Sequence, residues 1–84
     1  MPRPSDDEIA FALLRLAEER APKTFCPSEV ARRLAADWRP LMPDIRRVAA
    51  DLPLIATQRG QLTDALKARG PIRLQKRNKI YPLR

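Results

Sequence analysis

The segment from residue 26 to residue 52 constrains the fold of this chain most, because its pattern is that of two short amphipathic helices separated by a tight break. In the first helix, Val30, Ala31 and Leu34 form one apolar stripe. Ser28 is a good N-cap for this helix, because a serine hydroxyl can accept a hydrogen bond from a free backbone N–H of the first turn. We therefore expect a short helix that begins at Ser28.

The second helix of the pair has the same character. Its apolar side chains recur three and four residues apart, at Ile45, Val48, Ala49 and Leu52. Pro40 and Pro43 can lie only before this helix or in its first turn, where no backbone N–H is needed. We expect Trp38 to cover the junction between the two helices. Two helices joined in this way are the layout of a helix-turn-helix, a motif of nucleic-acid binding.

A longer helix is predicted ahead of this pair. Ser5 and Glu8 have the spacing of a capping box at its start, and Pro22 stops it because a residue before proline disfavours helical angles. Its apolar stripe contains Ile9, Leu13 and Leu16. Residues 23–26 follow as a short extended segment that can pair with a later strand.

The last third of the chain predicts two strands and a long loop. Residues 54–59 have the composition of a strand that ends at Gly60. Residues 71–77 alternate apolar and polar side chains, as a half-exposed strand does. We expect residues 61–70 to form the loop of this hairpin, with Thr63 as the cap of a single helical turn.

This order of elements predicts an α+β fold that is mainly α. The expected architecture is a winged helix-turn-helix of three helices, with a small antiparallel β-hairpin as the wing. We expect residues 1–84 to form a single domain, with a loose N-terminus at residues 1–4 and a basic tail at residues 78–84.

The composition argues against catalysis. The chain has no histidine and one cysteine, which removes the common zinc sites and the Ser-His and Cys-His nucleophile pairs. No apolar run approaches the roughly 20 residues that span a bilayer, and residues 1–8 contain no apolar secretory core. We therefore expect a cytoplasmic protein that is not an enzyme, needs no cofactor or metal and does not enter a membrane.

The net charge of +7 is concentrated in one part of the sequence. Residues 1–51 contain nine basic and nine acidic side chains, whereas residues 52–84 contain eight basic side chains and one acidic side chain. This asymmetry favours a polyanion as the partner of the C-terminal part. A basic tail that only improves solubility is the alternative.

Four blocks of the sequence resemble a small bacterial family known as domain of unknown function 3253. The blocks are Cys26-Pro27-Ser28-Glu29-Val30-Ala31-Arg32, Asp37-Trp38-Arg39-Pro40-Leu41-Met42-Pro43, Thr57-Gln58 and Ala68-Arg69-Gly70-Pro71-Ile72-Arg73-Leu74. The resemblance covers residues 7–77 and implies a winged-helix fold, but it brings no established activity.

Three arginines in or before the second helix of the pair are candidates for contacts with DNA bases. They are Arg39, Arg46 and Arg47. Arginine suits this role because its planar fork can contact O6 and N7 of guanine together. Asp44 and Asp51 flank two of these arginines in the sequence, so a solvated surface with internal ion pairs is an equal alternative.

Six cations on or beside the hairpin are candidates for contacts with phosphates. They are Arg59, Lys67, Arg69, Arg73, Lys76 and Arg77. Such cations bind the DNA backbone without reading its sequence, and about six contacts predict that log K falls with log salt at a slope of roughly −5. Tyr81 is the only aromatic side chain near them, which argues against stacking of a single strand.

The sequence therefore favours a small winged-helix protein that binds double-stranded DNA in the manner of a transcriptional regulator. A homodimer would add the specificity that one short recognition helix lacks. The alternative is a winged-helix protein-interaction module whose basic wing binds an acidic partner. The sequence does not distinguish DNA from structured RNA.

Overall fold

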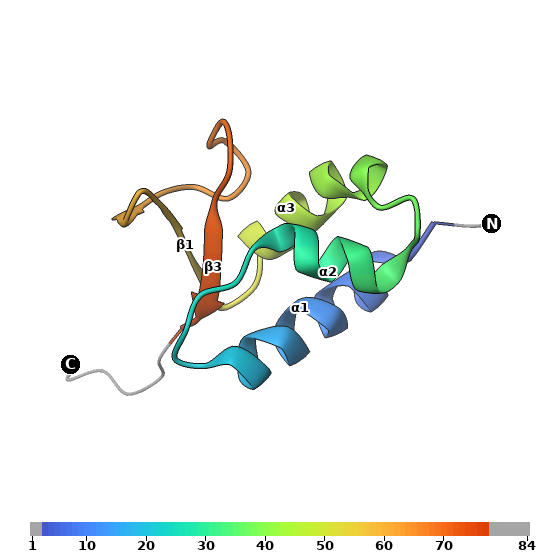
Figure 1. The fold of residues 1–84 in the computed structure, drawn as a ribbon, viewed down its shortest axis with the longest axis horizontal. Coiled ribbons are helices and arrows are strands. Elements are labelled where there is room, and N and C mark those ends of the chain that lie inside the picture. Colours follow the sequence, from blue (N-terminus) through green and yellow to red (C-terminus); the bar gives the residue numbers. More distant parts are fainter. Residues whose placement is uncertain (1–2, 78–84) are drawn as a thin grey trace.

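The computed structural model describes residues 3–77, and the expected basic tail at residues 78–84 lies outside them. Its elements in chain order are α1 (Asp6–Arg20), α2 (Pro27–Leu34), the 3-10 helix η1 (Arg39–Leu41), α3 (Met42–Ala50), β1 (Leu54–Gln58), β2 (Gln61–Leu62) and β3 (Arg73–Lys76). The helices pack together on one side and the sheet stands beside them (Figure 1). This arrangement confirms the predicted α+β, mainly α, winged-helix-like fold.

The first helix begins and ends where its local signals predict. The backbone N–H of Glu8 donates to the hydroxyl of Ser5, and the N–H of Ser5 donates to the carboxylate of Glu8. These reciprocal bonds form the predicted capping box. The helix ends at Arg20, one residue before the Ala21-Pro22 pair. Ile9, Leu13 and Leu16 are all buried, so the predicted apolar stripe is the face that α1 turns to the core.

The second helix starts two residues earlier than expected. Its N-cap is Cys26, not Ser28, and Pro27 occupies the first helical position. Proline suits that position because its missing N–H would be unpaired there in any case. Glu29 then accepts a hydrogen bond of 3.1 Å from the backbone N–H of Cys26, which an acid at the third position of a helix can do.

The third helix is entered through a short 3-10 turn. Pro40 lies in η1 and Pro43 in the first turn of α3, as the absence of an N–H in proline requires. Ile45, Val48 and Ala49 are buried, as predicted. The helix ends at Ala50, so Leu52 lies outside it, because Pro53 leaves no room for a further turn.

The sheet has three strands in the order β2-β1-β3, where the sequence predicted two. β2 is the strand that was missed, since we expected its residues to lie in the hairpin loop. Gln58 pairs with Gln61, so Arg59 and Gly60 form a two-residue turn between β1 and β2. β3 pairs antiparallel with β1, and Ala56 opposite Leu74 is buried against the helices. β1 and β3 are each shorter than the strands that we expected.

Residues 23–26 contribute to the other edge of this sheet, as predicted. The backbone N–H of Phe25 donates to the carbonyl of Leu74 at 2.7 Å, and the N–H of Leu74 donates back at 2.8 Å. The Phe25 side chain is fully buried. This bridge connects the α1–α2 link to the sheet.

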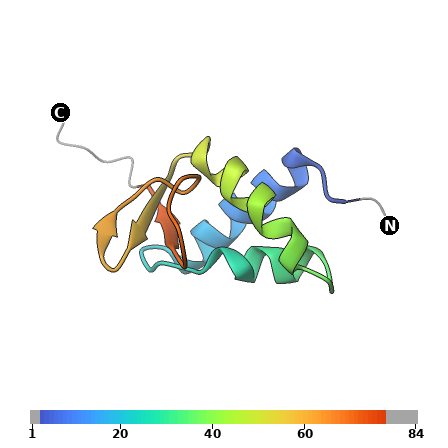
Figure 2. The same cartoon turned by 90° about the horizontal axis from the view of Figure 1, so that it is seen from above.

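We call residues 59–72, between β1 and β3, the wing. It begins with the two-residue turn and β2, and a second turn follows at residues 65–67. The cap of this turn is Asp64 rather than Thr63, because the carboxylate of Asp64 accepts from the backbone N–H groups of Leu66 and Lys67. A carboxylate binds two such donors better than a hydroxyl does. Seen from above, α3 crosses in front of α1, and the wing lies to one side of the helices (Figure 2).

Arg3, in the segment before α1, contacts the start of α3. Arg3 donates a hydrogen bond of 2.7 Å to the carbonyl of Pro40 and lies 3.1 Å from the carboxylate of Asp44. These contacts attach the segment before α1 to the start of α3. None of the helices within residues 3–77 is long and apolar enough to cross a membrane.

Candidate nucleic-acid interface

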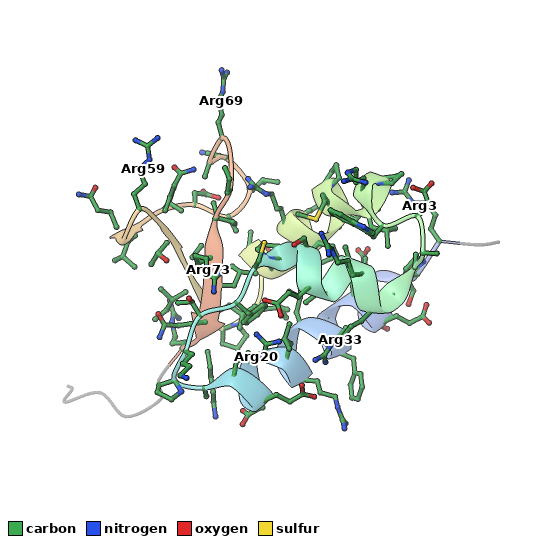
Figure 3. All side chains as sticks on the ribbon, viewed as in Figure 1. Arg3, Arg20, Arg33, Arg59, Arg69 and Arg73 are labelled. Carbon is green, nitrogen blue, oxygen red and sulfur yellow. The ribbon has the colours of Figure 1, made fainter. Side chains whose placement is uncertain are left out.

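Three cations of the wing are exposed and have no acidic partner. They are Arg59, Lys67 and Arg69, and we call them the wing cations. Within residues 3–77, none of their side chains forms an ion pair. Arg59 and Arg69 stand at the two tips of the wing and point away from the body of the protein (Figure 3). Cations in this state can bind an external anion without first breaking an internal pair.

Arg46 of α3 holds the wing against the helices. Its Nη1 donates to the carbonyl oxygen of Ala68 at 2.6 Å, and its Nη2 donates to the carbonyl oxygen of Gly70. The two acceptors lie 22 and 24 residues after Arg46 in the sequence. Arg46 therefore joins α3 to the wing, and fewer of its five N–H donors remain for a base edge.

Gln58 of β1 holds the same segment from the other side. Its Nε2 donates to the carbonyls of Arg69 and Pro71, the latter at 3.1 Å. Together Gln58 and Arg46 satisfy the four consecutive carbonyls of residues 68–71 in alternation. The tip that carries Arg69 is consequently fixed in position relative to α3.

Arg47 is paired with acids of its own chain. Its guanidinium donates to both carboxylate oxygens of Asp6, at 2.8 and 2.9 Å, and lies 3.4 Å from Asp44. The pKa of Asp6 is lowered, mainly by this hydrogen bond, and the pKa of Arg47 is raised for the same reason. The pair is open to solvent, since 47% of the Arg47 side chain is exposed. This is the internal ion pairing that the sequence left as an equal alternative to base contact.

The predicted cations in or next to β3 are divided between two places. Arg73 donates to the hydroxyl and the carbonyl of Thr24, at 3.1 and 3.2 Å. Lys76 forms an ion pair of 2.7 Å with Glu18 of α1. Arg77 is exposed beside Pro53, at the end of the sheet next to α1. Lys76 and Arg77 therefore do not share a surface with the wing tips.

A second set of unpaired cations lies on the two sides of the turn between α2 and η1, with Arg32 in α2 and Arg39 in η1. The guanidinium carbons of Arg32 and Arg39 each lie 4.6 Å from the centre of the Trp38 ring. We call Arg32 and Arg39 the turn cations. Neither side chain forms an ion pair within residues 3–77, and both are exposed. Trp38 itself is half-buried against the core, as expected of a cover for the junction between the helices.

The structure brings together only part of the predicted set. The wing is bonded to α3 through Arg46, and Arg39 lies in η1, directly before α3. Two contributors were missed by sequence reasoning. Arg32 was not among the candidates, because its place beside Trp38 depends on the turn between the helices. Gln58 is part of the Thr57-Gln58 block, but its partners lie 11 and 13 residues further along the chain, so the block did not indicate its role.

The described part of the chain offers no site for a metal ion. Within residues 3–77, no group of three or more Cys, Asp and Glu side chains converges on one point. The unpaired guanidinium and ammonium groups of the wing and turn cations can bind anions.

Three helices, a three-stranded antiparallel sheet and a basic wing define a winged-helix-like protein of the α+β class. The family described as "Protein of unknown function (DUF3253)" matches residues 6–77. The chain belongs to this family, which agrees with the resemblance seen in its four sequence blocks.

One further similarity extends to a much larger protein. DNA polymerase 1 of Saccharolobus solfataricus (strain ATCC 35092 / DSM 1617 / JCM 11322 / P2) is 37% identical over 59 residues. The matched stretch is 64% of this chain and 7% of the polymerase. The chain therefore spans only a small fraction of the length of that relative.

Proposed function

We propose that this protein binds double-stranded DNA and that its main contacts are made with the phosphate backbone. The observation that carries the proposal is the position of the unpaired cations. The wing that carries three of these cations is bonded to α3 through Arg46, and the turn cations lie beside Trp38, just before α3, so two basic clusters adjoin the helix that a helix-turn-helix protein inserts into the major groove. Cations on both sides of the inserted helix can reach the phosphates on both sides of the groove.

Base readout by α3 is the less supported part of the proposal. Arg46 and Arg47 were predicted to read bases, but each already binds acceptors of its own chain. A base contact would have to replace these bonds. Sequence-independent binding is therefore the larger component of the proposed affinity. A role as a transcriptional regulator requires that Arg47 break its ion pair with Asp6 and bind a base instead. Such a role also requires the cytoplasmic location that the sequence predicts.

The similarity to a polymerase is consistent with this proposal. DNA polymerase 1, by its name, acts on DNA, and the matched stretch covers a small part of it. We propose a role in binding, without catalysis, for the stretch that the two chains share.

A homodimer formed through α1 would combine the wing and turn cations of two copies in one complex. Phe11 and Leu14 of α1 are 66% and 38% exposed and lie three residues apart, so they share one face of the helix. Because α1 lies behind α3 and the wing lies to one side, a contact through α1 would leave the basic clusters free (Figure 2). We include this dimer in the proposal, and sedimentation at several concentrations tests it.

The second candidate function is binding of an acidic protein partner through the wing. Leu62 and Leu66 are 80% and 54% exposed and lie among the wing cations. An apolar centre with a charged rim is typical of a protein interface. A phosphate backbone makes no use of these leucines, so their exposure is the observation that favours a protein partner.

A salt titration tests the leading proposal. Affinity for a labelled duplex of about 20 base pairs is measured by fluorescence anisotropy from low to physiological salt. Five phosphate contacts predict a slope of log K against log salt of about −4.5, because each contributes about −0.9. Absence of duplex binding at low salt would exclude the proposal. Binding that Leu62→Ser abolishes while Arg59→Gln leaves it intact would favour the protein-interaction role.

A further inference from the structure

The two tips of the wing enclose a polar hollow. Its volume is about 920 Å³, and it is lined by Gln58, Arg59, Gln61, Arg69 and Arg73 among others. Three of these are arginines and none of the lining residues is acidic. Within residues 3–77, Arg59 and Arg69 have no ion pair. The hollow therefore combines concave shape with positive charge that nothing inside it neutralises.

The walls of this hollow are held before any ligand arrives. Gln58 and Arg46 bind the carbonyls of residues 68–71, which fixes the tip that carries Arg69. Arg73, which also lines the hollow, donates two hydrogen bonds to Thr24, and these bonds limit the motion of the Arg73 side chain. A site with prearranged donors loses less conformational entropy on binding than a flexible one.

Arg59 has an unfavourable backbone conformation for its residue type. Its φ is +54°, and the φ of Gly60 is +81°. A two-residue hairpin turn requires positive φ at both positions, and asparagine, aspartate or glycine is favoured at the first of them. Arginine is sterically disfavoured at this position, because its Cβ crowds the backbone in the left-handed region. A turn selected for stability alone would carry asparagine, so the arginine points to a use for its charge.

We infer that this hollow is a phosphate-binding site for the backbone of duplex DNA, and that Arg59 is kept at the turn to contact that phosphate. The inference rests on the proposed function and locates its phosphate contacts. A phosphate accepts hydrogen bonds from arginine forks on two sides, and Arg59 and Arg69 stand on two sides of the hollow. The lining contains no aromatic side chain, so the hollow suits a backbone phosphate rather than a stacked base.

The decisive variant is Arg59→Asn, for which stability and binding should change in opposite directions. Asparagine fits the turn, so the melting temperature should stay the same or rise. Binding of the duplex should weaken, and the salt slope should become shallower by about one unit because one phosphate contact is lost. Arg69→Ala should give the same loss of slope, since the backbone carbonyl that Gln58 holds is unaffected by that change.

Two controls separate the charge of Arg59 from its general effects. Arg59→Lys keeps the charge and should retain the slope of the original protein. Arg15→Gln removes one positive charge from α1, outside the hollow, and should leave the slope unchanged. Anisotropy titrations over salt and thermal unfolding monitored by circular dichroism give both readouts for every variant.

The outcomes distinguish this inference from the proposed function. If the original protein binds the duplex and Arg59→Asn binds with an unchanged salt slope, the hollow is not the phosphate site and the proposed function stands. A lower melting temperature in Arg59→Asn would show that arginine supports the turn, which overturns the argument from strain. If the original protein does not bind the duplex at low salt, the proposed function fails and the inference fails with it.

Discussion

Arg46 of α3 and Gly70 of the wing are joined by a hydrogen bond from the guanidinium to the backbone carbonyl, and a second bond of 2.6 Å runs from Arg46 to the carbonyl of Ala68. Arg46→Ala should therefore lower the free energy of unfolding by about 1–2 kcal/mol, since two bonds to a charged donor are lost at a half-buried site. Urea denaturation measures this change. Amide exchange should accelerate in residues 66–71 and remain slow in α1.

Arg47→Ala is the matched control for that prediction, because Arg47 follows Arg46 in the same helix and its ion pair with Asp6 is exposed. An exposed ion pair is screened by solvent, so Arg47→Ala should lose less stability than Arg46→Ala. If the two variants lose the same stability, Arg46 is not the link between α3 and the wing.

Asp6 makes part of the stability depend on pH. Its pKa in the folded protein is lowered by the hydrogen bond from Arg47, so the ionised form stabilises the fold above the ordinary pKa of aspartate, about 4. That contribution is lost as the pH falls through the lowered pKa. We expect urea midpoints to decrease below about pH 4 in the original protein and to decrease less in Asp6→Asn.

Asp7→Asn provides the comparison for Asp6→Asn. Asp7 is also exposed in the first turn of α1, but its carboxylate forms no ion pair within residues 3–77. Both substitutions remove one negative charge from the helix start, so the helix-dipole effect is common to both. Equal pH profiles for the two variants would contradict a specific contribution of the Asp6–Arg47 pair.

The turn cations should contribute to DNA binding through Arg32. Arg32→Ala is expected to make the salt slope shallower by about one unit, because one phosphate contact is removed. Arg33→Ala should leave the slope unchanged, since Arg33 is bound to Glu19 at 3.0 Å. Identical slopes for the two variants would mean that the stack on Trp38 is not part of the interface.

Fluorescence offers an independent measurement of the same cluster. Trp38 is the only tryptophan of the chain, and its ring lies 4.6 Å from both turn cations. Addition of duplex should change its emission, and added salt should reverse the change. Emission that is unaffected by saturating duplex would indicate that DNA is bound elsewhere on the protein.

The two phenylalanines should respond very differently to truncation. Phe25 is fully buried, and Phe25→Ala should lower the free energy of unfolding by about 3–5 kcal/mol. Phe11 is 66% exposed, so Phe11→Ala should change stability little. If α1 forms the proposed dimer, Phe11→Ala should reduce self-association in sedimentation experiments. A large loss of stability in Phe11→Ala would contradict its exposed position.

The helices could be predicted because their signals are local. The Ser5–Glu8 capping box and the prolines act within one turn of the backbone, and the apolar stripes of α1 and α3 follow from residue spacing alone. The start of α2 was misplaced because a proline at the first helical position outweighs a serine one residue later.

β2 could not be predicted in the same way. It contains two residues, too few for an alternating pattern, and the turn before it carries arginine where the usual hairpin signal is asparagine or aspartate. Its pairing with β1 becomes apparent only when the backbone has been bent at Arg59 and Gly60.

The sequence by itself determined the three helices, the pairing of residues 23–26 with a later strand, the excess of positive charge and the family. Only the tertiary structure decided which cations are free to bind an anion. Arg46 finds its acceptors in the wing and Arg47 finds Asp6 at the start of α1, 41 residues away. The physical reason is that the number of charged side chains follows from the sequence alone. Whether a charge is paired depends on which acceptor the folded backbone brings within about 3 Å of it.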